Sequence, residues 1–534
     1  MDLILMNDDN MYDYFEALLY DSNTELRPKW KKETSVGRGL TDYNIQALLG
    51  AKSLLYEQDD AEKQICLLET MQKFLQEYIG IEGLEELLIN NYGTIENSIF
   101  LEHDGQGNPV HTREHAKHQM KNAYLGSELL LNYGYLRNMA ETIYAGNSIT
   151  TQYLVDQASN ALGEQATSED IIDKLEELCY KIFMVASMLH DIGYPLEFYL
   201  RATEKLTDYP PYLKILSPTI KTDFAEVKAH LQGSQLFKQM KSESIKEKYL
   251  RNDHGVLSAV SFLMHFYYNG LIFSLDPIDR CLIEMAAIAI YCHTDRLNDV
   301  FRMVYAQDPI SYMVRLCDEL QEWDRFKLLI SDKHNYLQCC NCGKILHEEN
   351  KHYACECGRE YVKVTQIKNR KVNYVCLCDN IVIAKNEGPD KATVEVRINF
   401  DYMKQIEILL DDYSAVIRYD KGLQKAKNLV MDQRMDPEMT IDYFVSNNPI
   451  CIIEKMIAQS GKTDEEIKDW IKKRDAVKSR NLKMFYDDFL EKKQNNPFGL
   501  ELEYNSLKYE KPVQEYVLNN YGEIYSLYCM LMDT

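Results

Sequence analysis

Apolar residues recur at helical spacing through most of the middle of the chain. Short polar loops separate the segments where this periodicity is strongest, which are residues 177–189, 255–268, 277–292 and 311–323. Asp276 followed by Pro277 is a typical helix start, because the aspartate caps the first turn and proline needs no hydrogen bond there. The pattern predicts a mainly α protein built around a helical core.

The pattern changes at two places, which predict domain boundaries. Residues 103–109 (HDGQGNP) form a turn-rich break, and beyond about residue 332 helical stripes give way to glycines, paired cysteines and short alternating segments. Residues 393–400 alternate like a strand, and a later helix is opened by a capping box of Thr463 and Glu466. We therefore expect a helical N-terminal region (1–105), a helical core (106–332), a cysteine-rich module (333–385) and a small α+β region (386–534).

The net charge, the length of the apolar runs and the first residues of the sequence limit the kinds of partner that we expect. Lys and Arg number 60 against 83 Asp and Glu, and the net charge of -23 disfavours non-specific nucleic-acid binding. A local basic pocket for a phosphorylated small molecule remains compatible with this balance. No apolar run reaches the roughly 20 residues that span a bilayer, and the acidic start MDLILMNDDN is unlike a secretory signal. We expect a cytoplasmic protein with no membrane partner.

Seven cysteines lie between residues 339 and 378, in close pairs that indicate metal binding in an intracellular chain. The spacing C-x2-C followed by C-x-C predicts a closed structural zinc site. Its four ligands are expected to be Cys339, Cys342, Cys355 and Cys357. Cys340, Cys376 and Cys378 are left unassigned, and an iron-sulfur cluster, a redox switch or RNA binding through the module are the alternatives.

A histidine and an aspartate end the apolar segment MVASMLHDIGYP, where Gly193 and Pro195 stop the helix. Imidazole nitrogen beside carboxylate oxygen suits iron, manganese, zinc or magnesium. Taken alone, the pair His190-Asp191 is as well explained by a helix-terminal histidine that faces the carbonyl dipole.

Further candidate ligands surround this pair in the sequence. His111, His115 and His118 follow one another at i, i+4 and i+7, which predicts one helical face. His254 opens a helical segment, and His293 ends another. Asp318 stands among apolar residues, where an unpaired charge would be costly.

The order of these residues resembles the HD superfamily of metal-dependent phosphohydrolases, over roughly residues 110–325. The resemblance implies an HD-domain helical core with the zinc-binding module appended. It implies that a first metal ion is held by His118, His190, Asp191 and Asp318. His254 and His293 match the extra pair that holds a second ion in binuclear members. The segment RExHAKH implies that Arg113 and His115 face the substrate, and the 72 positions between His118 and His190 predict an insertion near residues 137–170.

The implied chemistry is hydrolysis by a metal-activated water, with one or two ions of Mn, Fe, Mg or Zn. His115, His254 and His293 are candidate acid-base groups or substrate contacts, the last two if only one ion binds. Basic residues near the motifs are candidate phosphate ligands. They are Arg113, Lys121, Arg251, Arg296 and Arg315, and a surface salt bridge is the alternative for all except Arg113.

The substrate class that the resemblance favours is a nucleotide. We expect a deoxynucleoside triphosphate triphosphohydrolase, which would form a homo-oligomer. The alternatives are a phosphodiesterase for cyclic mono- or dinucleotides, and a nucleotide-sensing protein whose pocket binds without cleaving.

Overall fold

The computed structural model describes the helical middle of the chain almost continuously and the remainder in segments. The main described ranges are 3–7, 74–84, 101–103, 109–111, 115–194, 223–294, 304–321, 326–339, 345–347, 361–376, 378–387, 392–401, 426–431, 433–446, 460–473 and 476–494. Only the backbone is described in strands β2 to β6. No helix among these residues is long and apolar enough to cross a membrane.

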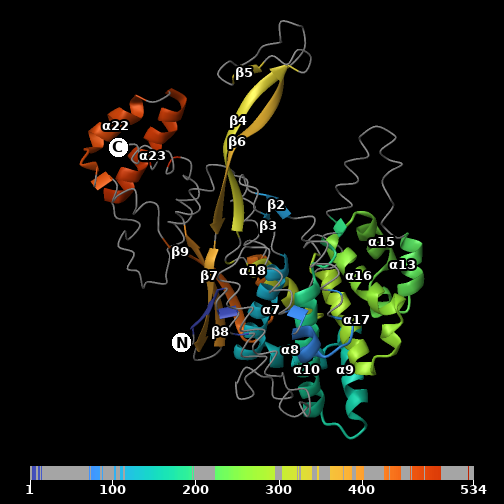
Figure 1. Ribbon diagram of the computed structural model, residues 1–534. Coiled ribbons are helices and arrows are strands. Elements are labelled where there is room, and N and C mark those ends of the chain that lie inside the picture. The colour runs from blue at the N-terminus through green and yellow to red at the C-terminus, as the bar shows by residue number, and fades with distance from the viewer. Residues whose placement is uncertain are drawn as a thin grey trace, which may run out of the picture.

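Five helices form the centre of the core, at the lower right of Figure 1. They are α7 (His115–Asn132), α10 (Ser168–Leu189), α16 (His254–Tyr268), α17 (Pro277–Cys292) and α18 (Pro309–Leu320). Helix α10 packs against α7, α17 and α18, and its last eight residues are all buried. Gly126 permits the closest approach of α7 to α10, because an added Cβ would lie 1.9 Å from the Phe183 ring. The prediction of a mainly helical fold is confirmed.

Capping side chains define where these helices begin. Thr167 and Asp170 form a capping box at α10. The Asp276 carboxylate accepts the backbone N–H groups of Ile278 and Asp279, just after Pro277, as the sequence predicts. Thr463 caps α22 (Asp464–Lys472) in the predicted box. The segment predicted over 311–323 begins earlier, at Pro309 behind an Asp308 cap, and ends at Leu320.

Two helices occupy the residues predicted as an insertion, α8 (Tyr135–Ala145) and α9 (Ile149–Leu162). Arg137 on α8 donates to four carboxylates, three of them on α10. The remaining core helices are α13 (Phe224–Leu231), α14 (Gln235–Gln239), α15 (Ser242–Leu250) and the short turn η3 (Leu271–Phe273).

A four-stranded sheet joins the start of the chain to its second half. Its order is β1 (Leu3–Met6), β7 (Cys378–Glu387), β8 (Ala392–Asp401) and β9 (Glu438–Ser446). β8 and β9 are parallel, and the other pairs are antiparallel. The Tyr133 hydroxyl donates to the Ile383 carbonyl at 3.0 Å, which fastens the sheet to the helical core. The strand predicted over 393–400 is confirmed as β8.

The cysteine-rich segment contains a long antiparallel pair that extends away from the core in Figure 1. β4 (Phe326–Cys339) pairs with β6 (Tyr361–Cys376), and β5 (Ile345–His347) adds to the tip. These strands are longer than the short alternating segments that the sequence indicates. Cys339 and Cys376 end β4 and β6. The predicted zinc site lies outside the described residues, since its other three cysteines do and only the backbone of Cys339 is given.

One prediction near the start of the core is wrong. His111 lies in β3 (Pro109–His111), which pairs with β2 (Leu101–His103), and not on one helix with His115 and His118. The backbone of residues 109–111 uses its hydrogen bonds in this hairpin, so α7 begins only at His115.

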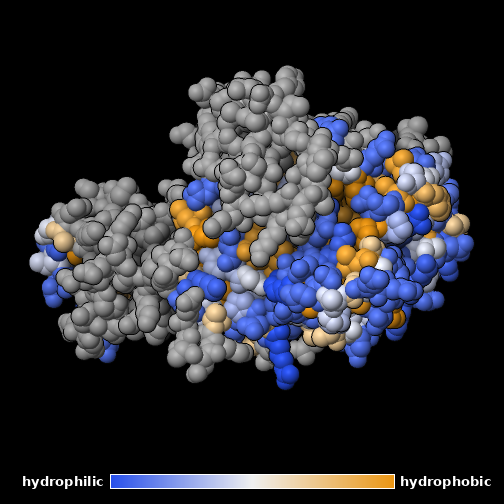
Figure 2. Space-filling view, turned by 90° about the horizontal axis from the view of Figure 1, so that it is seen from below, coloured by the Kyte–Doolittle hydropathy of each residue, from blue (hydrophilic) through white to orange (hydrophobic). Residues whose placement is uncertain are grey.

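Beyond the sheet, α22 is followed by α23 (Ala476–Gln494). Hydrophilic residues cover most of the described surface on the face that Figure 2 shows.

Candidate metal centre

The ends of five helices bring six histidine and aspartate side chains together. His190 and His293 are the C-terminal caps of α10 and α17, and His254 is the first residue of α16. The other members are His118 in the first turn of α7, Asp191 directly after α10, and Asp318 in the last turn of α18. All six predicted metal ligands therefore meet at one place.

Four of them form a first ligand set. The Nε2 atom of His118 lies 2.9 Å from Asp318 Oδ1 and 3.5 Å from Asp191 Oδ2. The Nε2 atom of His190 lies 3.3 Å from both His118 Nε2 and Asp318 Oδ1. Ligand atoms of His118, His190 and Asp318 all lie within 4.8 Å of one another, a spacing that suits one small cation.

A second set lies on the other side of Asp191. Its Oδ1 atom is 3.5 Å from His293 Nε2 and 3.7 Å from His254 Nε2, while its Oδ2 atom faces the first set. His190, Asp191 and His293 also qualify as a group that would hold an ion. Asp191 thus has the position of a carboxylate shared by two ions.

The tautomers of two histidines fit this assignment. His190 Nδ1 donates to the Ser187 carbonyl at 2.8 Å, and His293 Nδ1 donates to the Ile290 carbonyl at 2.6 Å. In the neutral form of each ring, the Nε2 atom then carries a lone pair directed into the cluster. The Nε2 atom of His293 is buried without a hydrogen-bond partner in the described part of the chain, as expected of a metal ligand. The residues present therefore fit a divalent metal.

Two further residues support the ligands, and the sequence reasoning did not identify them. Glu197 is buried, and its Oε2 atom lies 3.1 Å from Nδ1 of His254. The side-chain amide of Gln321, also buried, contacts Nδ1 of His118. A histidine that binds metal usually makes such a contact through its other nitrogen. The available signal for Glu197 was a carboxylate in the apolar turn that follows the His-Asp pair.

The charges of the cluster are strongly coupled. Burial alone lowers the pKa of His190, but the carboxylates of Asp191 and Asp318 outweigh it and raise that pKa to about 9. Burial raises the pKa of both aspartates, yet the neighbouring histidines hold each pKa well below its ordinary value. Both carboxylates are therefore ionised at neutral pH, which is the form that binds a cation.

The turn after the His-Asp pair is held against α16. The backbone N–H of Gly193 donates to the Ser258 hydroxyl at 2.8 Å. An added Cβ at Gly193 would lie 2.3 Å from the Ser258 nitrogen, so the contact requires glycine. Next to His293, the Thr294 hydroxyl donates to Asp253 at 2.8 Å, and Asp253 caps the helix that begins with His254. These contacts fix the two sets relative to each other.

The structure gives the predicted substrate residues different surroundings. Arg113 and Arg296 lie outside the described residues, as does the side chain of His115, the first residue of α7. Lys121 is buried and donates to the backbone carbonyl of Trp323, with its ammonium 5.4 Å from the indole centroid. Arg315 is also buried, within α18. Arg251 is exposed and pairs with Glu247, which agrees with the salt-bridge alternative.

No protein-family model, curated protein or solved structure matches this chain.

Proposed function

We propose that this protein is a divalent-metal-dependent phosphohydrolase that acts on nucleotides. The observation that carries the proposal is the position of Asp191 between two ligand sets. Its Oδ2 atom lies 3.5 Å from His118 Nε2, and its Oδ1 atom lies 3.5 Å from His293 Nε2. Two adjacent ions that share one carboxylate are typical of centres that cleave phosphate esters and anhydrides.

The six side chains would hold the ions, and one side of the centre is more accessible to solvent than the other. His118, His190 and Asp318 would hold one ion, His254 and His293 the other, with Asp191 between them. A bound ion would supply Lewis acidity and a water of lowered pKa. The side chains of His190 and His293 are 0% and 1% exposed, whereas those of Asp318 and His254 are 20% and 31% exposed. A phosphate group would therefore reach the centre from the side of Asp318 and His254.

If only the first set holds an ion, His254 is the exposed imidazole that remains to protonate a leaving group. Burial lowers its pKa, but Glu197 and Asp191 outweigh burial and raise it. The Glu197 carboxylate at Nδ1 stabilises the charged ring and orients Nε2 toward the centre.

For the particular reaction we propose triphosphohydrolysis of a deoxynucleoside triphosphate, which releases tripolyphosphate and a nucleoside. The order of the six ligands, as in HD phosphohydrolases, supports this choice, together with the large regions appended to the core. The two ligand sets that meet at Asp191 also support a phosphodiesterase for cyclic mono- or dinucleotides, since two-metal centres suit that reaction.

Product analysis separates these activities. Full-length protein loaded with Mn²⁺, Fe²⁺, Mg²⁺ or Zn²⁺ is incubated with deoxynucleoside triphosphates and cyclic nucleotides, and the products are identified by chromatography. Tripolyphosphate with nucleoside supports the first activity, and linear phosphates support the second. Nucleotide binding without any product supports a sensing protein and contradicts the proposal.

Variants test the site itself. His190→Ala and Asp191→Ala are expected to lower the rate at least a thousandfold, because each removes a ligand of the proposed centre. Asp156→Ala, an exposed aspartate on α9, is the matched control and should leave the rate unchanged. Activity that survives both ligand variants would place the reaction elsewhere.

A further inference from the structure

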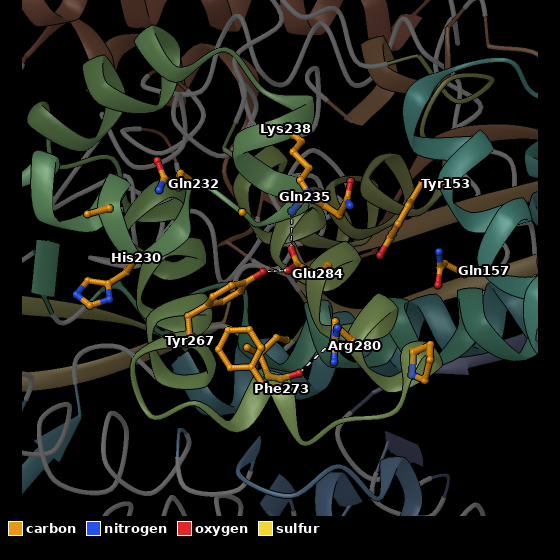
Figure 3. A pocket seen from close by; sticks show the side chains of 14 residues that line it. Tyr153, Gln157, His230, Gln232, Gln235, Lys238, Tyr267, Phe273, Arg280 and Glu284 are labelled. Atoms are coloured by element: carbon orange, nitrogen blue, oxygen red, sulfur yellow. Dashed lines mark hydrogen bonds between the residues drawn. The ribbon is translucent and has the colours of Figure 1, made fainter.

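A cavity lies at the other end of two of the helices that carry the metal centre. It has a volume of about 560 Å³ and is lined by residues of α9, α13, α14, α16 and α17 (Figure 3). Helix α16 contributes His254 to the centre and Tyr267 to this cavity, a separation of roughly 20 Å at 1.5 Å per residue. Helix α17 likewise connects Glu284 in the cavity to His293. The two sites are therefore distinct and share two helices.

The inner wall of the cavity carries a buried carboxylate. Glu284 is 3% exposed and accepts hydrogen bonds from the Tyr267 hydroxyl and, at 2.7 Å, from the backbone N–H of Gln235. A carboxylate offers about four acceptor positions, so roughly two remain after these bonds. Because a buried carboxylate is stabilised by each donor it gains, this wall favours a ligand with N–H groups.

Two basic side chains lie around the same cavity, as Figure 3 shows. Lys238 is exposed and makes no close ion pair or hydrogen bond within the described residues, although its charge acts on the Glu284 carboxylate. Arg280 donates to the carbonyls of Ile272 and Leu275, which leaves about three of its five N–H groups for a ligand. An anionic group, and a phosphate in particular, is the natural partner of this pair.

Aromatic side chains form another part of the cavity wall. Tyr153, Tyr267 and Phe273 line the cavity, and Phe273 is 72% exposed although it is apolar. The flat ring of a ligand can stack on an aromatic side chain with little loss of conformational entropy, because the side chain has few torsions to fix. The volume lies in the range of sites that enclose small organic ligands.

We propose that this cavity is a binding site for a nucleoside monophosphate, with the N–H groups of the base at Glu284 and the phosphate at Lys238 and Arg280. The base would lie against Tyr153, Tyr267 and Phe273. The site stands apart from the metal centre, so this binding does not depend on the reaction proposed above.

The test measures binding to full-length protein by isothermal titration with AMP, GMP, CMP and UMP. A chelator is present throughout, so that no metal ion at the centre contributes a phosphate contact. At least one nucleotide is expected to bind with a stoichiometry of one per chain. Lys238→Ala should weaken that binding about tenfold or more, as the loss of a charge-assisted hydrogen bond implies. Lys246→Ala removes an exposed lysine of α15 outside the cavity and should have no effect.

Glu284→Gln is the second variant, since an amide keeps the size of the side chain but replaces an acceptor by a donor. It should weaken binding of the preferred base by about tenfold and change the order of preference among the four nucleotides. Circular dichroism checks that this buried variant folds, and Lys238→Ala tests the proposal independently of it. Absence of binding at millimolar nucleotide, or binding that Lys238→Ala leaves unchanged, overturns the proposal. Neither result bears on hydrolysis by metal-loaded protein, which fails or succeeds separately.

Discussion

At the scale of single residues, Glu197 contacts His254, the histidine of the metal centre that is most accessible to solvent. Its carboxylate lies 3.1 Å from His254 Nδ1, whereas His190 and His293 have backbone carbonyls at the same position. Only one of these three histidines therefore depends on a replaceable side chain for its orientation. A substitution of Glu197 should therefore affect the second metal site and not the first.

Glu197→Gln is expected to weaken the second metal site about 10- to 100-fold and to leave the first site unchanged, because the amide lacks the charge that orients His254. Metal titration followed by elemental analysis of bound metal measures the effect on each site. Glu164→Gln, at an exposed position between α9 and α10, is the control. Equal loss at both sites, or no loss, contradicts the assigned role.

Glu128 on α7 predicts a pH dependence of stability. Burial raises its pKa from 4.5 to about 7, although the Asn132 amide that donates to it lowers the pKa. Because the folded chain binds this proton more tightly than the unfolded chain, the contribution of Glu128 to stability is fully present below pH 4.5 and is lost as the pH rises through about 7. The loss amounts to about 3 kcal/mol at most.

Glu128→Gln should therefore raise the free energy of unfolding at pH 8 by about 1–3 kcal/mol and reduce its slope between pH 5 and 7. Urea unfolding at several pH values measures both. If the variant and the parent show the same slope, Glu128 is not the group responsible. Glu164→Gln again serves as the exposed control.

Six ligands were predictable from the sequence because the order in which they follow one another resembles that of HD phosphohydrolases. His190 and His293 end helical stripes, and Asp318 is a charge among apolar residues. Glu197 and Gln321 gave no comparable signal, since their roles depend on which histidine lies opposite them after folding. The burial of Lys121 was equally hidden, because the carbonyl that it contacts belongs to Trp323, far along the chain.

At the scale of elements, helix limits followed from caps more closely than from periodicity. The helix predicted over 277–292 is observed with those bounds, since Asp276 and Pro277 fix its start. The predicted start of the histidine-rich helix was too early, because backbone pairing of β3 with β2 includes His111. The lengths of β4 and β6 were also missed, since the pairing of distant segments is not visible in local alternation.

The contact between the turn at Gly193 and α16 predicts a cost for any side chain there. Gly193→Ala is expected to lower the free energy of unfolding by about 1–3 kcal/mol, because the new Cβ meets the backbone of Ser258 at 2.3 Å. Metal affinity should fall as well, since the displaced turn carries Asp191. Denaturant unfolding and metal titration measure the two effects.

Gly233→Ala is the matched control, because an added Cβ there has nothing within 4 Å. Its stability should change by less than about 1 kcal/mol. Equal stability of the two variants would mean that the turn and α16 separate without cost.

At the scale of the whole molecule, the proposed centre links five helices from distant parts of the core, so a bound ion stabilises the folded chain. At a hundredfold excess over its Kd, an ion that binds only the folded state adds about 2.7 kcal/mol. The midpoint for unfolding of the helical core (residues 115–320) as one unit should then rise by roughly 5–10 °C. Differential scanning calorimetry with chelator and with each metal tests this expectation.

Asp191→Ala should abolish the rise, and Asp156→Ala should preserve it. A rise of the same size in Asp191→Ala would assign the stabilising ion to a different part of the chain.

The predicted zinc module, the four-part division and the homo-oligomer remain predictions. They concern regions or partners that lie beyond the described helical core.

The pairing of β1 with β7 has a consequence for synthesis on the ribosome. Leu3 lies opposite Ala384, so β1 leaves the ribosome long before its partner strand has been made. The helices of the core lie between residues 115 and 320, so this part of the chain is made well before that partner emerges. Throughout this interval β1 presents unpaired backbone groups, which are a hazard for association with other chains. A chaperone that covers β1 would protect this protein during the delay.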